Sequence, residues 1–116
     1  AVETIEVCGD LLRMHCVWRS RSDERIRSES RRLMTLDGDA PHEIEFLWRD
    51  CATSARAEAW LDGCDIVARM TARRPDEVRY AWSNNPESGL ICDGDGMLIP
   101  PFRLTLPTDD DKGIHA

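Results

Sequence analysis

Apolar and polar residues alternate along most of the chain, and this period of two is the feature that most constrains its fold. Successive side chains of a β-strand point to opposite faces, so a half-buried strand shows this pattern. The clearest case is a pair of alternating runs on either side of Gly9-Asp10, with apolar positions at Ile5, Val7, Leu12, Met14, Cys16 and Trp18. Two such runs around a glycine-containing turn predict a β-hairpin.

Further runs of the same kind follow along the chain. Alternation and β-branched or aromatic residues predict strands at 44–48, 66–70 and 77–82, and the turn-forming residues 83–86 end the last of them. The Asp62-Gly63 pair favours a hairpin between the segments 55–61 and 66–70.

For three segments the sequence leaves the secondary structure open or limits the kind of strand that can form. Residues 55–61 are rich in Ala, Arg and Glu, which favour a helix, but they also alternate like a strand. The highly charged segment 19–32 fits either a long loop or a polar edge strand. Residues 97–106 contain Pro100-Pro101, so they can form only an edge or bulged strand.

These patterns together predict the fold class. About seven to eight short strands with frequent turns, and no clear long helix, predict an all-β, antiparallel β-sandwich of the immunoglobulin-like type. A chain of 116 residues is the size of one domain. We expect a single sandwich over residues 1–106 and a disordered acidic tail over 107–116.

The charge balance excludes some partners. Fifteen Lys plus Arg against 22 Asp plus Glu give a net charge of −7, which disfavours nucleic acid and anionic membrane surfaces. No apolar run approaches the ~18 residues that a membrane helix needs. Residues 1–4 show no signal-peptide pattern, and a leader cleaved before Ala1 stays open.

Neither a metal nor a cofactor is expected. The chain has five cysteines, an odd number, and none of them forms a C-x-x-C spacing: Cys8, Cys16, Cys51, Cys64 and Cys92. Structural zinc sites use short paired spacings, so zinc is not indicated, while a Cys51–Cys64 bridge stays open. The loop 93–96 resembles a calcium loop only faintly, because Leu104 stands where an EF-hand has its bidentate Glu.

The most distinctive residues lie in the C-terminal third. They read Val78-Arg79-Tyr80-Ala81-Trp82, then Asn85-Pro86, and further on Pro101-Phe102-Arg103. This pattern resembles the C-terminal end of the sialate O-acetylesterase family, carbohydrate esterases whose catalytic domain is an SGNH-type hydrolase. The chain departs from the family pattern at Gly89, which replaces an Asn, at 97–99, and in a longer loop over 91–95. The upstream strand order is also similar, but only the 78–103 motifs are specific.

The resemblance implies an accessory role. In that family the catalytic Ser, Asp and His lie before the matching region, so no catalytic residue is carried onto this chain. The implied partner is an upstream hydrolase domain of the same polypeptide, which hydrolyses O-acetyl esters on sugars. Such enzymes are mostly exported or lysosomal. Surface apolar residues of this chain would then be covered by the hydrolase domain.

The motif also has a purely structural interpretation. Val78, Tyr80 and Trp82 share one face of a strand, where the two aromatic rings would be buried. Phe102 would also be buried, while Arg103 would pair with an acidic group or a carbonyl.

A second hypothesis is a stand-alone carbohydrate-binding or interaction module without catalysis. Trp60 is out of phase with the apolar positions around it, so it is the candidate sugar contact. The pair Asp39 and His42 has a D-x-x-H spacing but no nucleophile motif, and we interpret it as a solvated turn. The three histidines, scattered along the sequence, indicate no site.

Overall fold

The structure is a computed structural model that describes residues 2–22, 25–38, 40–41, 43–50, 53–71, 73–81 and 90–107. Its strands are β1 (Val2–Cys8), β2 (Leu11–Cys16), β3 (Trp18–Ser22), β4 (Arg25–Glu29), β5 (Met34–Thr35), β6 (Ile44–Trp48), β7 (Thr53–Arg56), β8 (Glu58–Asp62), β9 (Asp65–Arg69), β10 (Glu77–Tyr80), β11 (Ile91–Cys92) and β12 (Phe102–Thr105). The described residues form no helix.

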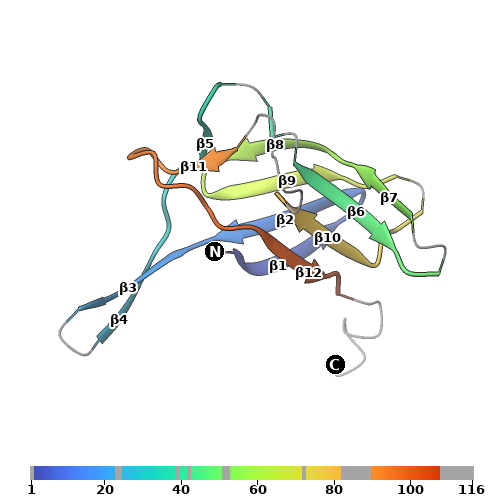
Figure 1. Ribbon diagram of the computed structural model, residues 1–116. Coiled ribbons are helices and arrows are strands. Elements are labelled where there is room, and N and C mark those ends of the chain that lie inside the picture. Colours follow the sequence, from blue (N-terminus) through green and yellow to red (C-terminus); the bar gives the residue numbers. More distant parts are fainter. Residues whose placement is uncertain are drawn as a thin grey trace.

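Two four-stranded antiparallel sheets face each other (Figure 1). The first sheet has the order β1-β2-β9-β8 and the second the order β12-β10-β6-β7. Setting aside the strands of two small side sheets, this is the immunoglobulin arrangement A-B-E-D against G-F-C-C′. The predicted all-β, immunoglobulin-like sandwich is therefore confirmed, with eight strands in the two main sheets.

The ambiguous segment 55–61 changes sheet in its middle. β7 pairs with β6 of the second sheet, whereas β8 pairs with β9 of the first. Between them, the Ala57 N–H donates to the Ile44 carbonyl at 2.9 Å. The helical interpretation of this segment is wrong, because backbone partners on both sides hold it extended.

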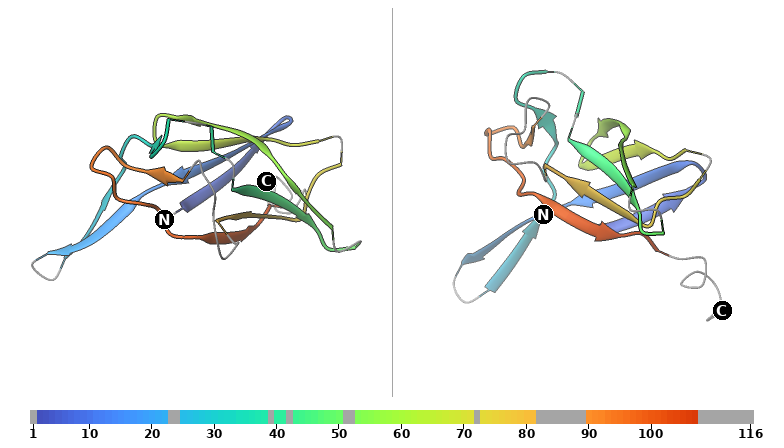
Figure 2. Two further views of the ribbon diagram at one scale, coloured as in Figure 1. Left: turned by 45° about the horizontal axis from the view of Figure 1, so that its top comes forward. Right: turned by 45° about the vertical axis from the view of Figure 1, so that its right-hand side comes forward.

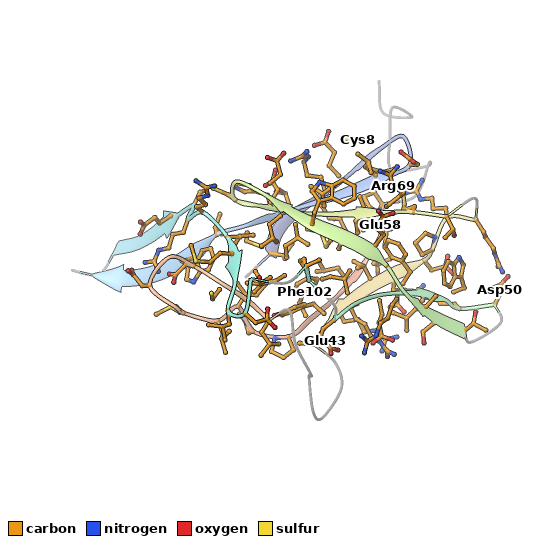
Figure 3. All side chains as sticks on the ribbon, turned by 90° about the horizontal axis from the view of Figure 1, so that it is seen from above. Cys8, Glu43, Asp50, Glu58, Arg69 and Phe102 are labelled. Atoms are coloured by element: carbon orange, nitrogen blue, oxygen red, sulfur yellow. The ribbon has the colours of Figure 1, made fainter. Side chains whose placement is uncertain are left out.

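The core lies between the two sheets. Burial alternates along β2 and β6 as the period of two predicts. The large, fully buried side chains of this core come from both sheets and the β11 segment: Leu12, Met14, Cys16, Ile44, Phe46, Ile66, Val78, Tyr80 and Ile91. Figure 3 shows Phe102, labelled, between the sheets.

One predicted strand is shorter than expected. The sequence predicts a strand over 77–82, but β10 ends at Tyr80. Ala81 has a φ of 53°, in the left-handed region that interrupts an extended chain. Its N–H still donates to the Glu43 carbonyl at 3.0 Å. Trp82, Asn85 and Pro86 of the motif lie outside the described residues.

The charged segment 19–32 forms most of a hairpin. β3 and β4 pair with each other from Trp18↔Glu29 to Ser22↔Arg25. This β3–β4 arm projects away from the sandwich (Figures 1 and 2). The proline-containing segment 97–106 supplies β12 at the edge of the second sheet, as its prolines predicted.

A small ribbon completes the fold at the end of the sandwich from which the arm projects. β5 pairs with β11, and Cys92 forms a further bridge to Leu98. The ribbon is tied to the core because the Ile91 N–H donates to the Tyr80 hydroxyl at 2.8 Å. The predicted tail from residue 108 onward lies outside the described residues. Within the described ranges, no helix is long and apolar enough to cross a membrane.

Candidate functional site

Three polar side chains form a hydrogen-bonded triad where the β3–β4 arm joins the first sheet. His15 Nδ1 lies 2.6 Å from Asp65 Oδ1, and His15 Nε2 lies 3.0 Å from Ser30 Oγ. When Nδ1 carries the proton toward Asp65, Nε2 accepts the Ser30 hydroxyl proton. The order of contacts is that of a nucleophile, a base and an orienting carboxylate.

The strand ladder and one loop contact place these residues together. His15 and Asp65 are directly paired across β2 and β9. Side chains of directly paired residues share a face of the sheet, so the imidazole and the carboxylate meet. Past the arm, the Leu33 N–H donates to the Gly63 carbonyl at 2.8 Å, which holds the segment after Ser30 against the β8–β9 turn.

Asp65 is held in its ionised form. Burial opposes ionisation of this carboxyl, but hydrogen bonds from Arg13 and His15 outweigh it and keep the pKa of Asp65 below its usual value. Arg13 Nη1 lies 2.8 Å from Asp65 Oδ2 and 3.0 Å from Asp62 Oδ2. Asp65 therefore presents one oxygen to Arg13 and the other to the imidazole.

Trp60, the candidate sugar contact, lies on the outer face of the first sheet. Ala59 and Leu61 pack toward the core on either side of it. Its cross-strand partner Val67 is fully buried although it is not part of the core between the sheets. Trp60 and its neighbours therefore cover Val67 from outside, and the half-buried ring has a structural role besides any sugar contact.

Arg69 covers one face of the same indole. Its guanidinium carbon lies 5.4 Å from the Trp60 ring centroid, a cation–π contact. Arg69 also pairs with Glu58 at 3.2 Å and with Asp10 at 3.1 Å. Figure 3 shows Arg69 and Glu58 beside each other on this side of the molecule. Arg69 therefore occupies a face of the ring that a sugar would otherwise stack on.

The motif arginines line a pocket on the outer face of the second sheet. This pocket of about 350 Å³ is lined by Leu47, Trp48, Arg49, Thr53, Ser54, Glu77, Arg79 and Arg103. Arg103 Nη2 lies 2.8 Å from Glu77 Oε2, and Arg49 Nη2 lies 3.3 Å from Glu77 Oε1. Arg103 is the main cause of a lowered pKa at Glu77. Arg79 pairs with Glu45 at 3.4 Å, so the cations here are matched by strand carboxylates.

Three apolar residues of the motif, Val78, Tyr80 and Phe102, contribute to the core of the sandwich. Val78 and Tyr80 are buried on the core face of β10. The Tyr80 ring stacks on Phe102 with centroids 5.4 Å apart and planes at 24°. Pro101, just before β12, is exposed.

Asp93 organises the glycine-rich turn at 93–96. Its Oδ1 accepts the N–H groups of Asp95 and Met97, each at 2.9 Å, and its Oδ2 accepts Arg31 Nη1 at 2.7 Å. Both oxygens of this carboxylate are thus engaged by donors of the protein. Across the part of the chain that the structure describes, no group of three His, Cys, Asp or Glu residues could hold a metal ion.

Sequence reasoning missed the triad because its members are far apart in the chain. Their hydrogen bonds join residues 15, 30 and 65, and the positions carry no local motif. The D-x-x-H pair Asp39 and His42 lies outside the described residues. Cys64 is a free thiol, and Cys51, its partner in the bridge that the sequence left open, lies outside the described residues.

The fold and its outer faces define an immunoglobulin-like β-sandwich with polar surface clusters, and comparison with known proteins adds a structural neighbour. A carbohydrate acetylesterase from Xanthomonas citri, described as novel, is similar with a TM-score of 0.67 and 22% sequence identity. The match covers 89% of this chain and 21% of that chain, so this chain spans about a fifth of the neighbour's length. At this identity the likeness shows a shared fold. No protein-family model matches the chain, and the comparison with curated proteins gives no match.

Proposed function

We propose that this chain is an accessory β-sandwich domain of a larger carbohydrate esterase. The main reaction, hydrolysis of O-acetyl esters on sugars, belongs in this proposal to an SGNH-type hydrolase domain upstream in the same polypeptide. The domain resembles the C-terminal domain of sialate O-acetylesterase-like enzymes. The supporting observation is the fold shared with about one fifth of a carbohydrate acetylesterase, together with the 78–103 motifs.

An exposed apolar surface gives the hydrolase domain a place to pack. The exposed large apolar side chains of the described residues all belong to the small ribbon: Met34, Leu36, Met97 and Leu98. We call this set the ribbon face. Cys92 pairs with Met34 on one side and with Leu98 on the other, so the three side chains form one row, with the buried Cys92 between the two exposed residues.

The apolar composition of the ribbon face is better explained if another domain covers it than if it stays exposed to solvent. Leu36 is 58% exposed and Met97 55% exposed, in a fold whose other large apolar groups are mostly buried. Exposed large apolar groups that gather in one part of a fold mark interaction sites. The occupant we propose is the hydrolase domain, because most of the neighbour's chain lies outside the region that matches this one.

The first test is the intact mass of the native polypeptide that contains residues 78–103. An antibody against the 116-residue chain should detect a species several times heavier than 13.2 kDa in its source. A native species near 13.2 kDa would contradict the accessory-domain proposal.

Charge on the ribbon face should weaken the packing of the two domains. In the native polypeptide, Leu36→Glu combined with Leu98→Glu should remove about 2–4 kcal/mol of inter-domain stabilisation, because two apolar side chains no longer bury. Thermal unfolding and limited proteolysis of the full polypeptide measure this loss. Ser54→Glu is the matched control, since Ser54 is exposed on β7 of the second sheet, away from the ribbon. Equal melting temperatures for both variants would rule out this face as the contact.

The alternative, a carbohydrate-binding module, rests on the outward-facing Trp60. Here we expect soluble acetylated oligosaccharides to change tryptophan fluorescence in the wild-type chain, and the change to disappear in Trp60→Phe. Trp18 and Trp48 are kept in Trp60→Phe, so the loss of the change in this variant assigns it to Trp60. Unchanged fluorescence up to millimolar sugar would exclude this alternative.

A further inference from the structure

We propose that the Ser30–His15–Asp65 triad makes Ser30 an acylatable nucleophile, a second ester-reactive site within this chain. The inference does not rest on the accessory-domain proposal, which assigns the main reaction to another domain. It rests on the three side chains and their contacts alone. The substrate class is small, activated acyl esters.

The geometry meets the distance requirement for nucleophile activation. A base within about 2.6–3.2 Å of the nucleophile, itself oriented by a third group, defines an activated serine. Ser30 Oγ to His15 Nε2 is 3.0 Å, and His15 Nδ1 to Asp65 Oδ1 is 2.6 Å. Both hydrogen bonds that the triad needs are therefore already formed in the structure.

The surroundings fix each member in place. The second carboxylate oxygen of Asp65 is held by Arg13 at 2.8 Å, which prevents the carboxylate from turning away from the imidazole. Arg31 follows Ser30 directly and is held by Asp93 at 2.7 Å, while its guanidinium lies 5.5 Å from the Trp18 ring centroid. The Arg13–Asp65 pair thus holds the carboxylate of the triad, and the Arg31–Asp93 pair holds the chain next to Ser30.

The chemical step follows from these contacts. Ser30 Oγ attacks the ester carbonyl carbon while its proton moves to His15 Nε2. The C–O bond to the leaving group breaks, and the protonated imidazole returns the proton to the leaving oxygen, which leaves acyl-Ser30. Water then attacks the acyl carbon with the same imidazole as base, and Ser30 and the free acid are regenerated.

Exposure of the site sets the substrate class. Ser30 is exposed and His15 is 38% exposed, so water is not excluded from the reaction. Stabilisation of an oxyanion is weaker in water than in an enclosed site. We therefore expect reaction with aryl acetates and organophosphorus probes, whose leaving groups need little help.

The experiment is covalent labelling of the full chain with p-nitrophenyl acetate and, separately, with a fluorophosphonate probe, followed by peptide mass spectrometry. We expect the label on Ser30, no label there in Ser30→Ala, and a labelling rate at least ~100-fold lower in His15→Gln. Ser54→Ala, which removes an exposed serine on the opposite sheet, should leave the rate unchanged. Asp65→Asn should slow labelling, and Asp65→Glu should restore part of the rate if the carboxylate orients the imidazole.

Two results would overturn the proposal: no fluorophosphonate label on Ser30, or an equal labelling rate in folded wild type and folded His15→Gln. If His15→Gln does not fold, the wild-type chain in guanidinium chloride decides. Unfolding separates residues 15, 30 and 65, so Ser30 must lose its reactivity there; a reactivity that survives unfolding contradicts the triad.

Discussion

A Tyr80→Ala substitution is expected to destabilise the sandwich by about 3–5 kcal/mol, which is a large part of the stability of a domain of this size. Tyr80 is 1% exposed and is among the largest fully buried side chains. Its ring stacks on Phe102, and its hydroxyl accepts the Ile91 N–H at 2.8 Å. The substitution therefore leaves a cavity between the sheets and an unsatisfied N–H in the ribbon.

Tyr80→Phe separates these two contributions. It keeps the ring and removes only the acceptor of the Ile91 N–H, so we expect a loss of about 1–2 kcal/mol. Urea unfolding followed by tryptophan fluorescence measures both variants. Hydrogen exchange at Ile91 should accelerate in Tyr80→Phe more than exchange in β2. Unchanged stability in Tyr80→Phe would mean that the hydroxyl contact does not tie the ribbon to the core.

The sequence predicted the parts of the fold that depend on neighbours along the chain. Alternation located β2 and β6, and Gly9-Asp10 and Asp62-Gly63 located two hairpins. The sheet change at Ala57 was not predictable from alternation, because the pattern continues unbroken across it. It depends on which backbone each half of the segment meets, β6 before Ala57 and β9 after it.

The local backbone conformation at Ala81 could not be predicted from the sequence either. Ala81 fits a strand by composition, but its φ of 53° ends β10 at Tyr80. Alanine carries no preference for the left-handed region, so only the tertiary contacts of the native chain select this conformation.

The candidate functional residues also fall into a part that the sequence predicted and a part that it could not predict. The stack of Tyr80 on Phe102 follows from a shared face of two motif strands, which the sequence placed correctly on the apolar side. The triad could not be predicted, because it depends on the path of the β3–β4 arm, which brings Ser30 back to His15. Exposed apolar residues were expected in general, but their gathering on the ribbon depends on the Cys92–Leu98 bridge.

Asp93→Ala is expected to lower the melting temperature on the order of 10 °C or more at neutral pH. The Asp93 side chain is 1% exposed, and its oxygens accept two backbone N–H groups and the Arg31 guanidinium. Removing the carboxylate leaves all three donors without this acceptor. Because Arg31 links the base of the arm to the 93–96 turn, both segments should lose order together.

The pH dependence of the melting temperature tests whether the negative charge of Asp93 causes this stabilisation. The hydrogen bond from the Met97 N–H is the largest cause, with Arg31 and the Asp95 N–H adding to it, of a pKa at Asp93 below its usual value. An acid whose pKa is lowered in the folded state adds stability above its unfolded pKa of about 4 and loses it as the pH falls through the folded pKa. The melting temperatures of wild type and Asp93→Asn should therefore differ most near neutral pH and converge below about pH 4.

The comparison isolates one carboxylate, since the other described acids with lowered pKa values, Asp65 and Glu77, are present in both proteins. Asp95→Asn is the matched control, because Asp95 is exposed in the same turn and only its backbone N–H contacts Asp93. Thermal unfolding of the three proteins across this pH range makes the measurement. A difference between wild type and Asp93→Asn that stays constant with pH would show that shape, and not ionisation, accounts for the role of Asp93 in joining the arm to the ribbon.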